Sequence, residues 1–254
     1  MENSWAPAYF ERRGTVATWW DPLADSDPAY RDWFLEQQKD VLAMARVKGR
    51  MVLDAGCGRG RATVAAALAG AAEVVGVDIS TQMLDLAREA AETARVADRV
   101  SFRQAGLEQL PLEDGTFDIA FLLEILLHLA DPVATLGELH RVLRPGGVLM
   151  VTTVGANPAA RLLQPSKLGA TPASRWKLAT ASALNTGMSA MFGFTWSNTR
   201  LTAALYRRLF NAPVRPTPPW RVRRLFAEAG FPVVYHRAVG PVLAPREHRW
   251  AVIK

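Results

Sequence analysis

The chain has 254 residues; half are hydrophobic, 21% are charged, and the formal net charge is +6. This composition is that of an ordinary globular protein, and the length allows one α/β domain with a sizeable insertion. No apolar run reaches the roughly 18 residues that span a bilayer, the first residues do not resemble a signal peptide, and the single Cys57 excludes an internal disulfide, so we expect a cytoplasmic protein.

Residues 1–48 are predicted to form a helical N-terminal extension that acts as a lid. Asp27-Pro28 is typical of a helix start. After it, several side chains recur near helical spacing: Trp33, Phe34, Gln37, Val41 and Met44. The aromatic residues before this helix either close over the mouth of a ligand site or cover the core of the extension: Tyr9, Phe10, Trp19 and Trp20.

From residue 49 onward, short apolar runs alternate with helical segments. Strands are predicted over 51–56, 73–78, 99–104, 117–123, 147–153, 232–239 and 249–253, with helices over 61–68, 80–94, 132–143 and 220–231. This alternation predicts a doubly wound, seven-stranded, mostly parallel sheet of Rossmann-like type. The domain is expected to comprise residues 49–154 and 219–254, with 155–218 as an inserted helical cap over the acceptor site.

A glycine-rich turn, "VLDAGCGRG", follows the first strand of this pattern. A dinucleotide site would have Gly-x-Gly-x-x-Gly, but Arg61 stands where the third glycine of that motif belongs. Asp54 puts a carboxylate where it would repel a pyrophosphate and suit a cation. Asp78, at the end of the second strand, can accept both hydroxyls of a ribose. The residues therefore favour S-adenosylmethionine, which has an adenosine, a cationic end and no phosphate.

Five segments in order resemble the class I S-adenosylmethionine-dependent methyltransferases that act on small molecules. These segments are "VLDAGCGRG", "VVGVDIS", "LEQLPLEDGTFDIAF", "EILLHLADP" and "RVLRPGGVLMVTT". The resemblance covers about residues 50–154 and implies the fold and the cofactor. It does not identify the substrate.

The resemblance also implies roles for individual residues. It implies that Asp54, Gly56 and Gly58 line the methionine end of the cofactor and that Asp78 binds the ribose. Further contacts are implied for Ile79, Met83, Gly106, Leu107 and Leu123. Gly106 stands where the family commonly has an Asp, so backbone groups would replace that contact. Two alternatives stay open: Asp78 as a helix N-cap only, and Met83 as an ordinary core residue.

The catalytic candidates are Glu124 and His128, which lie four residues apart after the fourth strand. On a helical turn they would share a face. The segment resembles a stretch of quinone-biosynthesis O-methyltransferases, some of which bind a divalent metal through two glutamates and a histidine. Leu127 replaces the second glutamate, so no metal is predicted. His128 would be a general base or would orient the substrate; the alternatives are a loop-capping His128 and a structural Glu124.

The segment 155–218 contains no acidic residue and mixes Arg and Lys with Trp, Phe, Met and Leu. It is interpreted as a cap over a hydrophobic substrate. Two alternatives are a membrane-surface patch that takes a lipid-soluble acceptor, and a basic solvated face or dimer contact.

The sequence thus predicts methyl transfer to a hydrophobic small molecule, with O-methylation preferred and C- or N-methylation open, in secondary-metabolite, quinone or lipid-like biosynthesis. A cyclase on the same scaffold is an alternative. A nucleic-acid methyltransferase is disfavoured, because positive charge alone supports only non-specific phosphate contacts and the segment after the fourth strand is too apolar to stack a base. A nicotinamide-dependent oxidoreductase is disfavoured by the glycine turn.

Overall fold

The computed structural model describes residues 28–154, 217–239 and 247–254, with side chains from residue 35 onward. In chain order the elements are α3 (Pro28–Ala45), β1 (Met51–Ala55), α4 (Arg61–Leu68), β2 (Glu73–Asp78), α5 (Thr81–Thr93), β3 (Val100–Gln104), β4 (Phe117–Leu123), α6 (Pro132–Val142), β5 (Leu143–Val154), α10 (Pro219–Glu228), β6 (Val233–Val239) and β7 (Glu247–Ile253). The aromatic residues predicted to form a lid, and the predicted cap up to residue 216, lie outside the described residues.

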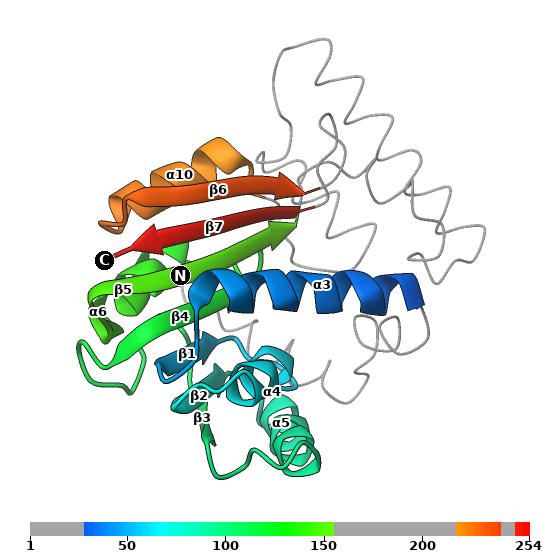
Figure 1. Ribbon diagram of the computed structural model, residues 1–254. Helices are drawn as coiled ribbons and strands as arrows, with labels where there is room; N and C mark the ends of the chain where they lie inside the picture. The colour runs from blue at the N-terminus through cyan, green and yellow to red at the C-terminus, as the bar shows by residue number, and fades with distance from the viewer. Residues whose placement is uncertain (1–27, 155–216, 240–246) are drawn as a thin grey trace.

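The strands form one seven-stranded sheet in the order β3-β2-β1-β4-β5-β7-β6 (Figure 1). The first five strands pair in parallel, and β7 runs antiparallel to both β5 and β6. The predicted α/β class and the mostly parallel sheet are therefore confirmed. The parallel order follows from the sequence because each crossover carries either a helix or, between β3 and β4, a long connection.

Helices cover both faces of the sheet (Figure 1). On one face the buried residues of α3 and α4 join those of β1, β2 and β4 in a core that includes Val41, Val52, Ala66 and Phe121. On the other face α6 and α10 pack over β4, β5 and β7, with Leu136, Phe226 and Trp250 fully buried. The end of the predicted N-terminal extension, residues 35–47, thus forms part of the first core.

Two strands, β5 and β7, begin two or more residues before their predicted starts. β5 begins at Leu143 instead of Gly147, because Leu143 already pairs with Phe117 before the register shifts to Val148 opposite Ile119. Gly146, at φ 78°, lies within this irregularity. β7 begins at Glu247 instead of Arg249, since Glu247 and His248 still pair with the end of β5. Glu247 and His248 are polar and lie outside the predicted strand, but both side chains are buried in the sheet.

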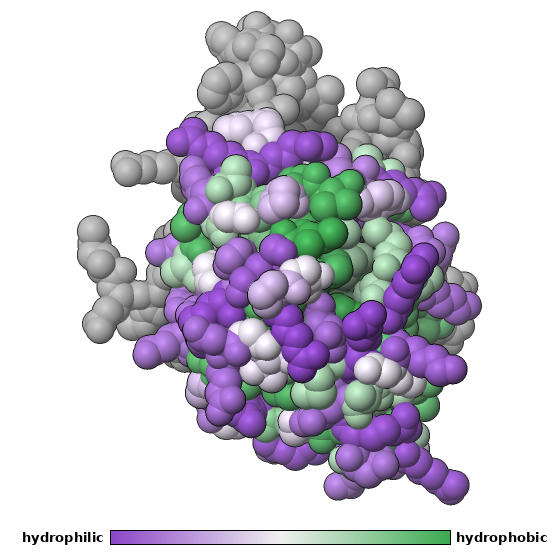
Figure 2. Space-filling model, turned by 60° about the vertical axis from the view of Figure 1, so that its left-hand side comes forward, coloured by the Kyte–Doolittle hydropathy of each residue, from purple (hydrophilic) through white to green (hydrophobic). Residues whose placement is uncertain are grey.

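The surface turned toward the reader in Figure 2 is mainly hydrophilic, with a hydrophobic area in its upper part. Among the described residues, the exposed large hydrophobic side chains are Leu35, Leu68, Val133, Trp220, Val234 and Tyr235. Half of these lie on α10 and β6, at the antiparallel edge of the sheet. None of the helices in the ranges described above is both long and apolar enough to cross a bilayer.

Candidate active site

The residues predicted to bind a cofactor gather at the carboxyl ends of neighbouring parallel strands. Asp54 and Gly56 lie at the end of β1, Asp78 ends β2, Gly106 follows β3, and Leu123 ends β4. β1 lies between β2 and β4, where the strand order reverses. Open α/β sheets bind ligands at this point, in the crevice beyond the strand ends.

Two glycines of the turn after β1 are required by both conformation and space. Gly56 has a φ of 77°, and a Cβ there would lie 2.6 Å from Ile125, in the loop after β4. Gly60, the residue before α4, has a φ of 75°, and a Cβ there would lie 2.9 Å from that of Ala87 on α5. Gly60 thus provides close helix packing, which a dinucleotide motif assigns to a glycine one position later.

The N–H groups of the glycine turn are bonded within the protein. Gly56 and Cys57 both donate to the Val77 carbonyl, at 2.8 and 3.0 Å. Gly58 donates to the Asp78 carboxylate at 2.8 Å. Phosphate-binding turns instead direct their N–H groups at the ligand. The N–H groups of Gly56, Cys57 and Gly58 are therefore engaged within the protein, which disfavours a pyrophosphate bound by these three donors.

Asp54 is a buried carboxylate behind this turn. Its Oδ2 accepts a hydrogen bond from the Thr63 hydroxyl of α4 at 2.6 Å. Burial raises the pKa of Asp54 to about 6, and the hydrogen bonds from Thr63 only partly oppose this effect. A cation at the strand ends would favour the ionised form. The predicted contact of Asp54 with the cofactor's ammonium region stays a prediction.

Asp78 organises the ends of β1 and β2 together. Its Oδ2 accepts from the Gly58 N–H after β1, and its Oδ1 accepts from the Ser80 N–H after β2 at 3.0 Å. The N-cap of α5 is Ser80, whose hydroxyl accepts from Met83 N, so the alternative that Asp78 serves only as the N-cap is wrong. Each carboxylate oxygen has two lone pairs. Asp78 can therefore hold the turn and still accept ribose hydroxyls.

The other predicted cofactor contacts lie around this carboxylate. The Ile79 carbonyl accepts from the Gln104 side chain at 3.1 Å, which ties the end of β3 to the start of α5. Ile79, Met83 and Gly106 are partly exposed, whereas Leu107 is buried and belongs to the core. A contact of Leu107 with an adenine would thus come from its backbone, as the sequence implied.

Glu124 and His128 lie in the loop between β4 and α6, but not on a helical turn. Ile125–His128 forms a turn closed by a hydrogen bond from His128 N to Ile125 O at 2.8 Å. Glu124 has a φ of 61°, in the left-handed region. The expectation that the two side chains share a helical face is therefore wrong, because the chain reverses direction right after β4. Both side chains are partly exposed.

A buried polar cluster at the same edge was missed by sequence reasoning. Gln37 of α3 donates to Glu124 Oε1 at 3.3 Å, and Asp40, one turn later, accepts from Arg249 of β7. Arg249 also donates to Glu247 at 2.9 Å, and both are almost fully buried. The sequence contains little that indicates this cluster. Gln37 lies among the apolar positions of a helix, and Glu247 and Arg249 lie two residues apart, as residues on one face of a strand do.

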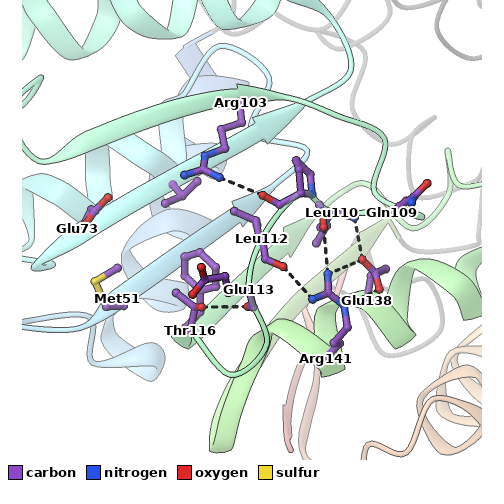
Figure 3. Close-up of a pocket in the computed structure, with 13 residues that line it drawn as sticks. Met51, Glu73, Arg103, Gln109, Leu110, Leu112, Glu113, Thr116, Glu138 and Arg141 are labelled. Atoms are coloured by element: carbon purple, nitrogen blue, oxygen red, sulfur yellow. Dashed lines mark hydrogen bonds and ion pairs between the residues drawn. The ribbon is translucent and has the colours of Figure 1, made fainter.

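A hollow of about 750 Å³ lies elsewhere, between the β3–β4 connection and the sheet (Figure 3). Its lining includes the first residues of three strands, Met51, Glu73 and Phe117. Arg141 of α6 anchors the connection by donating to the Leu110 and Leu112 carbonyls at 3.0 and 2.8 Å. Arg141 also lowers the pKa of Glu138 through their hydrogen bonds. Parallel sheets bind ligands at the opposite strand ends, so the candidate site is placed there.

Residues 53–151 match the family model described as a methyltransferase domain. A ubiquinone biosynthesis O-methyltransferase of Pseudomonas paraeruginosa is 36% identical over 151 residues, which cover 57% of this chain and 61% of that protein. The chain thus matches about three fifths of the length of that curated relative.

Solved structures resemble the fold over most of the chain. An S-adenosylmethionine-dependent methyltransferase from Mesorhizobium loti superposes with a TM-score of 0.61 at 19% identity, covering 86% of this chain and 96% of that one. The cyclase SpnF superposes with a TM-score of 0.57 at 21% identity, covering 80% of this chain and 60% of that one. At these identities the likeness concerns the fold alone.

Proposed function

We propose, from the premise that residues 53–151 belong to the class I S-adenosylmethionine-dependent methyltransferases, that this protein transfers a methyl group to a hydroxyl oxygen of a hydrophobic small molecule. The curated relative is named for O-methylation in quinone biosynthesis, which supports an oxygen acceptor on an apolar compound. Segment 155–218 supplies the cap over that compound in this proposal.

The observation that carries the proposal is the set of bonds around Asp78. The carboxylate accepts hydrogen bonds from the N–H groups of Gly58 and Ser80, so the Gly58 donor of the turn is engaged within the protein and is not directed at a ligand phosphate. The same carboxylate can accept ribose hydroxyls, and its charge attracts a nearby sulfonium. The buried Asp54 adds a second carboxylate behind the turn.

Bound S-adenosylmethionine supplies a methyl group made electrophilic by the adjacent sulfonium. Glu124 or His128 takes the proton of the acceptor hydroxyl while the oxygen forms a bond to the methyl carbon. The cofactor would supply the methyl group with cleavage of its carbon–sulfur bond, whose electron pair would stay on sulfur and neutralise the sulfonium. The products are a methyl ether, S-adenosylhomocysteine and a proton on the base. The protein's main tasks are alignment and exclusion of water.

Calorimetry with S-adenosylmethionine, S-adenosylhomocysteine and NAD tests the cofactor. We expect the first two to bind and NAD not to bind. Asp78→Ala should weaken binding by at least about a hundredfold, because the ribose loses its acceptors and the glycine turn loses its tie. Asp85→Ala is the matched control: Asp85 lies on α5 but is exposed, and its ion pair among the described residues is with Arg88. Wild-type affinity in the Asp78 variant would contradict the proposed site.

Trideuteromethyl-labelled cofactor tests the reaction. The enzyme would be incubated with apolar phenols, apolar amines and apolar carbon acids, and the products analysed by mass spectrometry. We expect label on the phenol oxygen. Label on nitrogen or carbon would move the proposal to another acceptor atom. Retention of the cofactor with a rearranged but unlabelled product would favour a cyclase, as in the fold neighbour SpnF.

A further inference from the structure

Gln37 is a polar residue at a core position of α3. Its side chain is fully buried, and its Nε2 lies 3.3 Å from Glu124 Oε1, across 87 residues of sequence. Within the described part of the chain, its Oε1 has no hydrogen-bond partner. Burying an amide with an unsatisfied oxygen is unfavourable, and an apolar residue of similar volume would avoid this cost. The bond to Glu124 is therefore the evident reason for a glutamine here.

Glu124 is held from two directions. Its backbone N–H donates to the Thr152 carbonyl and hydroxyl of β5, each at 3.1 Å, while its φ lies in the left-handed region. Such a conformation is unfavourable for a residue with a Cβ and occurs where surrounding contacts impose it, often at functional sites. The β5 bonds fix the backbone, and Gln37 contacts the carboxylate itself.

The position of α3 depends on a second contact with the sheet. Asp40 lies three residues after Gln37, on the same helical face, and accepts a hydrogen bond from Arg249. Arg249 pairs in register with Thr152, the residue that holds Glu124. Its guanidinium is almost fully buried and also donates to both oxygens of Glu247, at 2.9 and 3.5 Å. The contacts of Gln37 with Glu124 and of Asp40 with Arg249 thus join α3 to the sheet beside the Thr152–Arg249 pair.

We propose that Gln37 is a positioning residue for the Glu124 carboxylate, and that the Asp40–Arg249–Glu247 network holds α3 so that Gln37 reaches it. This inference rests on the proposed function, because it assigns Glu124 to proton transfer from the acceptor. The Gln37 amide fixes the orientation of the carboxylate and favours its charged form, since an N–H donor stabilises the anion.

The test compares two buried glutamines on the same helix. Gln37→Leu keeps the side-chain volume and removes the donor. Gln38→Leu is the matched control, because Gln38 is also buried and its Nε2 has no partner among the described residues. We expect Gln37→Leu to lower kcat by roughly tenfold or more, with KM for the acceptor and Kd for the cofactor within about twofold. Gln38→Leu should stay within about twofold of the wild type in all three.

A second readout does not require turnover. Carboxylate carbons would be titrated by NMR in protein labelled at glutamate side chains, with Glu124→Gln used to assign the Glu124 signal. We expect the pKa of Glu124 to rise in Gln37→Leu and not to change in Gln38→Leu. An unchanged pKa in Gln37→Leu, or equal losses of kcat in both variants, would overturn the positioning role. A pKa of Glu124 that rises in Gln37→Leu, together with no methyl transfer by the wild type, would instead overturn the proposed function and leave the contact between Gln37 and Glu124 supported.

Discussion

Asp54 is the residue whose burial has the clearest consequence for ligand binding. Its pKa is raised to about 6 by desolvation, so the folded protein favours the protonated form of this carboxyl. The stability that Asp54 contributes is therefore fully present below its ordinary pKa of 3.8 and is lost as pH rises from there through about 6, with a cost of roughly 3 kcal/mol above that pH. A cationic ligand requires the ionised form and would recover part of this cost.

We predict that the affinity for S-adenosylmethionine rises between pH 5 and pH 7.5 and levels off above that. Asp54→Asn should bind more weakly at pH 7.5 and show no such rise, because its amide does not ionise. At pH 8 the ligand-free variant should be at least as stable as the wild type, since it lacks a buried charge. Calorimetry across pH and urea unfolding check both points. An unchanged pH dependence of binding in Asp54→Asn would contradict this role.

The pattern of strands and helices was predictable from the sequence because its signals are local. Short apolar runs that alternate with helical segments marked β1, β2 and β4, and a serine N-cap marked α5. The position of the glycine turn at the strand ends followed from the same pattern. These elements are specified by neighbours in sequence, so their order and the sheet type could be predicted without long-range information.

The acceptor side of the site could not be predicted in the same way. Glu124 takes its left-handed conformation beside Thr152, which is 28 residues away, so the four-residue spacing of Glu124 and His128, which would put them on one face of a helical turn, was misleading. Gln37 was assigned to a helical stripe, but its partner is 87 residues away. Arg249 was predicted as the first residue of its strand, and Glu247 lay outside the predicted strand. Long-range contacts decide all of these positions.

Arg249 is expected to be the main polar link between α3 and β7. Arg249→Met should lower the free energy of unfolding by about 3–5 kcal/mol, because Glu247 would keep a fully buried charge without its partner. Adding Glu247→Gln should recover a large part of this loss. Urea unfolding measures both variants.

Arg88→Met is the control for this prediction, since the exposed Arg88–Asp85 pair should contribute less than about 1 kcal/mol. A loss for Arg249→Met no larger than that of the control would show that the buried network is energetically neutral. A double variant as unstable as the single one would show that the loss arises from packing instead of from the unpaired charge.

For the whole molecule, ligand binding should appear as thermal stabilisation. A ligand that binds only the folded chain at a hundred times its Kd stabilises it by about 2.7 kcal/mol, which for a protein of this size raises Tm by roughly 5–10 °C. We predict this shift with S-adenosylhomocysteine and none with NAD, measured by scanning calorimetry. Asp85→Ala should keep the shift and Asp78→Ala should lose it. A shift with NAD alone would contradict the assignment of the site.

The antiparallel end of the sheet affects how the chain folds during synthesis. β7 lies between β5 and β6, yet it comes after both of them in the order of the described strands. β7 begins roughly 90 residues after β5 ends. At typical translation rates, β7 is therefore synthesised about 5–20 s after the edge of β5 with which it pairs. During that interval the edge of β5 that pairs with β7 in the folded chain lacks this partner. Chaperone dependence should therefore be greatest for nascent chains that have not yet released β7, and sensitivity to premature stop codons should be high just before it.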